Sequence, residues 1–164
     1  MSKIFVRSAL VVFLLLSLAA LGQAQPPTTS GGSGEALLNL HNTVAVHGYD
    51  VVAYFTQNRP VPGNRRITQR LGMATYYFAS RQNRYTFLEN APMYQPQMGG
   101  FCATSMAMGR LEDINPSVFL IYRGKLYLFR DEAALDMFLR SPERTIYQAS
   151  QNYFEMARRH RSIY

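Results

Sequence analysis

Two stretches of the chain form a weak repeat of apolar positions at a spacing of 51 residues, in which Tyr76, Phe78, Phe87 and Leu88 match Tyr127, Phe129, Phe138 and Leu139. Residues 75–92, TYYFASRQNRYTFLENAP, match residues 126–142, LYLFRDEAALDMFLRSP. Each stretch begins with an aromatic-rich run typical of a β-strand and reaches a residue suited to capping a helix, Ser80 or Asp131. Apolar residues at helical spacing follow, and a proline ends each stretch. The pattern predicts a strand followed by a helix, twice.

A further apolar run precedes each predicted strand and indicates a hairpin. Residues 118–129 would form one hairpin with a turn at Gly124, and residues 67–78 the other with a turn at Gly72. Glycine adopts the positive φ that such tight turns require. We therefore expect an α+β fold in which two hairpin-plus-helix units pack into a small sandwich.

Three further elements complete the predicted fold. Residues 43–46, TVAV, resemble an edge strand, and Asp50 is suited to cap a short helical turn over residues 51–55. An additional C-terminal helix is expected over residues 143–158, because apolar residues recur there at helical spacing. Those residues are Ile146, Ala149, Tyr153 and Ala157.

The N-terminal residues indicate the compartment. Lys3 and Arg7 precede the apolar run 9–21, and small residues follow up to Ala24, which is the pattern of a cleaved secretory signal peptide. The next segment is rich in Pro, Gly, Ser and Thr, as flexible tethers are. We expect a periplasmic or secreted protein without a transmembrane span after signal cleavage. The predicted parts are a signal peptide (1–24), a flexible linker (25–40), a folded domain (41–157) and a basic C-terminal tail (158–164).

Composition and charge exclude several functions. The chain carries 17 Lys and Arg against 10 Asp and Glu, a formal net charge of +7, but no basic stripe with interleaved aromatics, so no nucleic-acid partner is expected. A single cysteine cannot form an intramolecular disulfide. The sequence also lacks the GxSxG, GxxxxGK[ST] and HExxH motifs. Glu112 and Asp113, close to Asn115-Pro116, are interpreted as carboxylates of a turn.

The cysteine lies among methionines. Met98, Cys102 and Met106 are spaced four residues apart, and Met108 follows, so on one helix the first three would share a face and could bind a soft ion such as copper(I). Met73, His41 and His47 are further ligand candidates. Two other interpretations stay open. The sulfur side chains could fill the core, or Cys102 could be a reactive thiol activated by His47, as in a thiol-dependent enzyme or redox sensor.

Several motifs together resemble the YHS-domain family, specifically its exported single-domain group. They are VAVHGYDVVAYF (44–55), TYYFAS (75–80), FLENAPMY (87–94), PQMGGFCA (96–103) and GKLYLF (124–129). Short members of this family resemble metal-binding domains with cysteine ligands, but the corresponding positions here are Ala53, Ala79 and Asn83. In the exported group the resemblance instead points to Cys102. It implies a pocket lined by Tyr49, Asp50, Tyr54, Tyr76 and Ser80.

The sequence therefore predicts an exported YHS-type binding or accessory module rather than an enzyme. Its partner would be a small ligand, a metal ion such as copper near Cys102, or a periplasmic protein. The alternatives are a thiol-dependent enzyme or redox sensor that uses Cys102 and His47, and a structural protein-interaction domain without a ligand.

Overall fold

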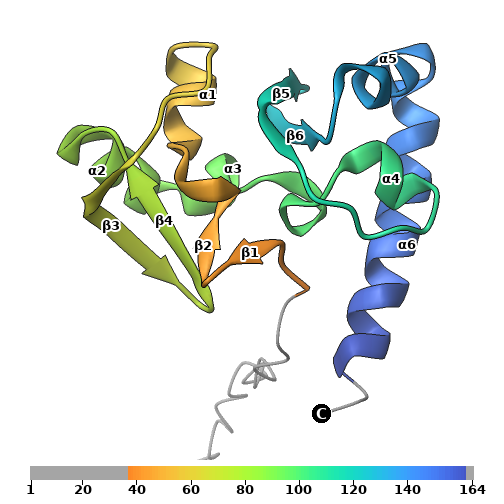
Figure 1. Ribbon diagram of the computed structural model, residues 1–164, viewed down its shortest axis with the longest axis horizontal. Helices are drawn as coiled ribbons and strands as arrows, with labels where there is room; N and C mark the ends of the chain where they lie inside the picture. The colour runs from red at the N-terminus through yellow and green to blue at the C-terminus, as the bar shows by residue number, and fades with distance from the viewer. Residues whose placement is uncertain (1–36, 162–164) are drawn as a thin grey trace, which may run out of the picture. The chain divides into compact units, whose positions relative to one another are not determined.

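The internal repeat is present in the backbone of the computed structural model, which describes residues 37–161 (Figure 1). Each copy is a hairpin followed by a nine-residue helix, which confirms the predicted α+β fold of two hairpin-plus-helix units. The first unit consists of β3 (Asn64–Leu71), β4 (Ala74–Phe78) and α2 (Arg81–Glu89). The second unit consists of β5 (Asn115–Tyr122), β6 (Lys125–Phe129) and α5 (Glu132–Arg140).

The two hairpins share one register, including its irregularity. Asn64 lies opposite Phe78 in the first unit, and Asn115 lies opposite Phe129 in the second. In both hairpins the register then shifts before the next paired residue, Thr68 or Phe119, as a β-bulge does. The repeat therefore extends to backbone detail that the sequence comparison did not contain.

The helix starts are equivalent too. The Ser80 hydroxyl accepts a hydrogen bond from the Asn83 amide at 3.1 Å, and a carboxylate oxygen of Asp131 accepts one from the Ala134 amide at 2.7 Å. Each cap satisfies one of the amides that the first turn of a helix leaves without a partner. Both predicted caps are confirmed.

A phenylalanine from each helix lies on the aromatic residues of its own hairpin. Phe87 and Phe138 are both fully buried, and their rings lie about 5 Å from the strand rings, a distance typical of favourable aromatic pairs. The strand rings are Tyr76 and Phe78 in the first unit, and Tyr127 and Phe129 in the second. These pairs form the centre of each unit.

The first hairpin belongs to a larger sheet. Its strand order is β1-β2-β4-β3, with β1 at Leu40–His41 and β2 at Val44–Ala45, while β5 and β6 form a separate two-stranded sheet. The prediction of an edge strand at 43–46 is wrong, because β2 is flanked on both sides. It pairs in parallel with β4, and the short β1 covers its outer side.

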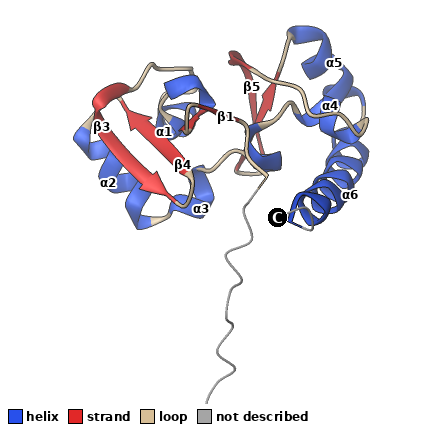
Figure 2. Cartoon of the chain, turned by 60° about the horizontal axis from the view of Figure 1, so that its bottom comes forward, coloured by secondary structure: helices blue, strands red, loops and turns tan. Residues whose placement is uncertain are grey.

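Short helices follow β2 and β4, as Figure 2 shows. Asp50 caps α1 as predicted, with its carboxylate 2.9 Å from the Val52 amide. The C-terminal helix α6 packs against α4. The remaining elements are η1 (Val46–Gly48), α1 (Val51–Thr56), α3 (Ala91–Tyr94), η2 (Gln97–Gly100), α4 (Ala103–Ala107) and α6 (Pro142–Arg161).

Two predicted boundaries differ from the structure. Residues 37–40, assigned to the linker, belong to the fold, since Leu37 is buried and its carbonyl accepts a hydrogen bond from the Tyr153 hydroxyl. The C-terminal helix also continues to Arg161 instead of ending at 158 before a tail. The predicted signal peptide, residues 25–36 and residues 162–164 lie outside the described residues.

Between residues 37 and 161, even the 20-residue α6 lacks the apolar length for a bilayer crossing.

Candidate metal centre

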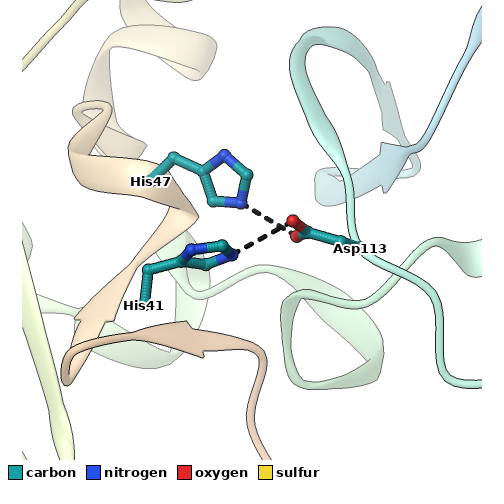
Figure 3. Close-up of side chains that lie close together, drawn as sticks. All are labelled: His41, His47 and Asp113. Atoms are coloured by element: carbon teal, nitrogen blue, oxygen red, sulfur yellow. Dashed lines mark hydrogen bonds and ion pairs between the residues drawn. The ribbon is translucent and has the colours of Figure 1, made fainter.

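Two histidines and an aspartate meet at the surface (Figure 3). The Nε2 atom of His41 lies 3.0 Å from one carboxylate oxygen of Asp113, and the Nε2 atom of His47 lies 2.8 Å from the other. The two imidazole rings lie edge to face with centroids 4.2 Å apart. One potential ligand atom from each of the three residues lies within 4.8 Å of the others.

A strained backbone segment sets the position of the His47 ring. Val46 and His47 have φ values of 50° and 51°, in the left-handed region, where a β-branched residue such as valine is a clear outlier. Such strain costs about 1–3 kcal/mol per residue and concentrates at functional sites. It turns the chain sharply between β2 and α1, where the His47 ring meets Asp113.

The other two residues come from distant segments. His41 ends β1, opposite Val44, so the β1–β2 hairpin carries it. Asp113 lies between α4 and β5, and one of its oxygens accepts hydrogen bonds of 2.8 Å from the Asn39 side chain and from the Ile114 amide. Burial favours the protonated acid, but the hydrogen bonds from Asn39, Ile114 and His47 outweigh it and lower the pKa of Asp113 to about 2. The carboxylate is therefore charged at neutral pH.

This ligand set suits a divalent transition-metal ion. Imidazole nitrogen and carboxylate oxygen are ligands for zinc, copper(II) and iron(II), whereas thiolate and thioether select copper(I). The side chains of His41 and Asp113 are about half exposed, at 55% and 48%, and that of His47 is 28% exposed. An ion held by these three side chains alone would keep a coordination position open, as in catalytic sites.

The predicted sulfur cluster has a different geometry. Met98, Gly99 and Gly100 have positive φ, which no α-helix accommodates, so α4 begins only at Ala103. Residues 98–106 therefore do not form the single helix that the spacing argument requires. Cys102 and Met106 are fully buried, Met98 is nearly so, and Met108 is 48% exposed. The four sulfur side chains are thus divided between the core and the surface.

The predicted partnership between Cys102 and His47 is not formed. Within residues 37–161, no hydrogen bond joins the Cys102 sulfur to the His47 ring, whose partner is Asp113. The Cys102 amide donates to the Glu112 carbonyl at 3.0 Å, and the side chain is inaccessible to solvent. A reactive thiol would need an opening of this part of the fold.

Most of the predicted pocket residues have structural contacts. Asp50 is fully buried and accepts hydrogen bonds from Val52, Ala79 and Asn83, which joins α1 to the start of α2. The Tyr54 hydroxyl donates to the Pro116 carbonyl at 2.8 Å, and burial raises its pKa. Ser80 caps α2, and Tyr49 forms an isolated β-bridge with Pro62.

Tyr76 does line a cavity. This cavity of about 310 Å³ lies between the β1–β2 hairpin, α3 and η2, with Leu38, Val46 and Met98 among its apolar walls. The Gln95 side chain donates to the Tyr76 hydroxyl at 3.4 Å. Burial raises the pKa of Tyr76, with the Gln95 hydrogen bond opposing it, so the phenol is neutral near pH 7.

The sequence does not predict that Asp113 contacts His41 and His47, and it suggests other partners for the two histidines. The sequence pattern places Asp113 in a turn, and its carboxylate does accept a hydrogen bond from the adjacent Ile114 amide. Its contacts with His41 and His47 span 72 and 66 residues, so no local spacing could reveal them. The sequence suggests the two histidines as additional ligands for the sulfur cluster, and His47 also as an activator of Cys102 or as a surface or edge-strand residue.

Comparisons of this chain with protein-family models, with curated proteins and with solved structures found no match. Ala53, Ala79 and Asn83, where the resemblance to short YHS modules would lead us to expect cysteine ligands, cannot supply a thiolate. A cysteine site of that type does not fit this chain, whereas the histidine–aspartate cluster offers ligands of another kind.

Proposed function

We propose that this protein is an exported YHS-type binding module that holds a divalent transition-metal ion at His41, His47 and Asp113. One observation carries the proposal: three potential ligand atoms, from segments far apart in sequence, lie within 4.8 Å of one another. Zinc–nitrogen and zinc–oxygen bonds are about 2.0–2.2 Å long, so an ion between these atoms requires only small side-chain movements.

The charge of the site supports this proposal. A carboxylate that stays ionised down to about pH 2 supplies a negative charge at every pH at which the protein is expected to work. Both imidazoles present Nε2 toward it, so an ion would replace the hydrogens that now occupy the space between them. The nitrogen and oxygen ligands favour zinc or copper(II) over the copper(I) expected from the sulfur residues.

The open position suggests an accessory role. A structural zinc site normally has four protein ligands, whereas this cluster offers three and is partly exposed. The fourth ligand would be water or a group from another molecule. We therefore propose a module that carries or presents its ion in the periplasm rather than one that uses the ion to hold its own fold.

The test is metal titration of the chelator-treated protein lacking residues 1–24. We expect one zinc or copper(II) ion per chain by native mass spectrometry and calorimetry, and affinity in His41→Gln and His47→Gln reduced by more than about 100-fold, since even outer-sphere partners contribute roughly 10–100-fold. His160→Gln is the matched control, because this histidine lies in α6 outside the cluster.

Cys102→Ser separates this site from the sulfur alternative. Stoichiometric binding that survives Cys102→Ser and is lost in His47→Gln would support the histidine site. Binding that is lost in Cys102→Ser and kept in His47→Gln would refute it, as would equal loss in His47→Gln and His160→Gln.

A small ligand in the cavity beside Tyr76 is the second candidate. The neutral phenol accepts from Gln95, and in residues 37–161 no acceptor takes its own hydrogen, so a ligand with a hydrogen-bond acceptor and an apolar body would fit. Native mass spectrometry of protein collected from the periplasm tests this function. An adduct should persist in His47→Gln and be lost in Tyr76→Phe. A bare mass in the parent protein would contradict it.

A further inference from the structure

A second charged surface lies in the first unit, where its lining residues come from β3 and the first half of α2. Figure 1 shows where these two elements lie in the fold. A cleft of about 250 Å³ is formed there by six residues, three of which are arginines and none of which is acidic. β3 is the outermost strand of its sheet, so the cleft lies at the sheet edge. The lining residues are Arg66, Ile67, Thr68, Arg81, Arg84 and Tyr85.

One of the three guanidinium groups is held in place by the protein. Arg84 Nε donates to the Thr68 carbonyl at 2.9 Å, and an Nη atom donates to the Gln69 side chain at 3.0 Å. The guanidinium carbon also lies 5.9 Å from the centroid of the Tyr85 ring. These contacts order the side chain without neutralising it, because its partners carry no charge.

Within the described part of the chain, the other two arginines have no acidic partner. Arg66 and Arg81 are exposed, and no ion pair within residues 37–161 involves either of them or Arg84. Elsewhere arginines do pair with carboxylates, as Arg130 does with Glu112 and Asp131. The cleft therefore concentrates positive charge that no carboxylate in residues 37–161 pairs with.

The repeat shows that the fold does not require these arginines. Moving 51 residues along the chain, Arg66 corresponds to Ser117, Arg81 to Glu132 and Arg84 to Leu135. The second unit has the same strand register and the same helix cap, and yet it begins its helix with an acidic residue. The basic cleft is thus a property of the first unit alone.

We propose that this cleft binds a phosphate group. Guanidinium groups match phosphate oxygens with paired hydrogen bonds, and several of them around one cleft favour a doubly charged anion over a single carboxylate. The volume accommodates a phosphomonoester of a small molecule or the headgroup of an anionic phospholipid. This inference is independent of the metal site, because none of the three arginines belongs to it.

The experiment is a titration of the chelator-treated protein at about 0.15 M ionic strength, where long-range charge effects are largely screened. The soluble probes are inorganic phosphate and glycerol phosphate, followed by NMR chemical shifts and calorimetry. The membrane probe is a set of phosphatidylcholine vesicles with and without phosphatidylglycerol. The test variant is the double substitution Arg66→Gln/Arg81→Gln in the cleft. The control is the double substitution Arg140→Gln/Arg144→Gln, which lies outside the cleft and changes the net charge by the same amount.

We expect saturable phosphate binding, with shifts at Thr68 and Tyr85, weakened at least about tenfold in Arg66→Gln/Arg81→Gln and unchanged in the control. If the protein binds only the vesicles that contain phosphatidylglycerol, and Arg66→Gln/Arg81→Gln weakens this binding while the control does not, the ligand is a lipid headgroup. Equal weakening in both double variants would reduce the effect to net charge and overturn the proposal. Absence of binding to every probe would overturn it as well. Circular dichroism checks that the variants fold.

Discussion

His41 and His47 lie edge to face on the two oxygens of one carboxylate, although one ring comes from a strand and the other from a strained 3-10 turn. This relationship joins the β1–β2 hairpin to the segment between α4 and β5. An ion at this point would link the same two segments, so residues that orient the carboxylate should influence its affinity.

Asn39 is one of the residues that hold the Asp113 carboxylate in place. Its side-chain nitrogen donates to Asp113 at 2.8 Å and to the Gly100 carbonyl at 3.1 Å. Asn39→Leu keeps the approximate size and removes the donor, so we expect zinc affinity to fall roughly 10–100-fold while all three ligands remain. A competition titration with a chromophoric chelator measures this change. An affinity equal to that of the parent would show that Asn39 does not position the ligand.

Gly99 and Gly72 provide a matched pair of backbone tests. Both have positive φ, but a Cβ at Gly99 would lie 2.2 Å from the Leu37 carbonyl oxygen, whereas a Cβ at Gly72 would meet nothing within 4 Å. We expect Gly72→Ala to lower the free energy of unfolding by about 1 kcal/mol through backbone strain alone. Gly99→Ala should cost about 2–4 kcal/mol, because the Leu37 segment must also move. Denaturant titrations give both values, and similar costs would contradict the contact.

Asp50→Asn should be far more costly than Asp131→Asn. One oxygen of Asp50 accepts from both the Ala79 amide and the Asn83 side chain, and the other accepts from Val52. An amide nitrogen in either place would face a donor inside the protein, so we expect a loss of about 2 kcal/mol in the free energy of unfolding.

Asp131 is the control for this substitution, because asparagine caps a helix about as well as aspartate does. Its replacement should change the free energy of unfolding by only a few tenths of a kcal/mol. Thermal and urea unfolding of the two variants compare them directly. Equal losses would mean that the second oxygen of Asp50 contributes little.

Glu112 should make stability depend on acid pH. A hydrogen bond from the Ser105 hydroxyl, together with Arg130, lowers the pKa of Glu112 from its ordinary value of 4.5. A carboxylate with a lowered pKa stabilises the fold above its unfolded-state pKa, and the contribution disappears as pH falls through the folded-state pKa. Ser105→Ala should therefore raise the pKa of Glu112 and flatten the loss of stability below pH 4.5. NMR titration of the side-chain carboxyl carbon tests this, and an unchanged pKa would contradict it.

Cys102 should react slowly with thiol reagents. Its side chain is fully buried, so alkylation requires an opening of the fold, and the rate should increase with denaturant. Labelling with iodoacetamide, followed by mass spectrometry, measures the rate against the unfolded chain. Labelling of the native protein as fast as that of the unfolded chain would restore the reactive-thiol interpretation.

The repeating pattern predicted the elements well, because it depends on local chemistry. Caps at Ser80 and Asp131, and turns at Gly72 and Gly124, are set by residues close in sequence, and all four are present. The order of the strands was less accessible. The pairing of β2 with β4 joins Val44 to Thr75, and no local pattern encodes such a contact.

The candidate site was less predictable for the same reason. The sulfur spacing suggested a shared helix face, but Gly99 and Gly100 break the helix and leave Met108 exposed while Cys102 is buried. Even within the repeat, Leu139 has the helical spacing of a core residue but is 50% exposed. Long-range contacts, rather than spacing, bring His41 and His47 to Asp113.

Because the two hairpins share one register, the second unit is an internal control for the first. Every position of the first unit has a counterpart 51 residues later, in a backbone of the same design but with different neighbours. Exchanging side chains between counterparts can therefore separate what the backbone demands from what a ligand demands, without a relative from another species. At the starts of α2 and α5, where one copy has Arg81 and the other Glu132, the scaffold has left the surface free to diverge.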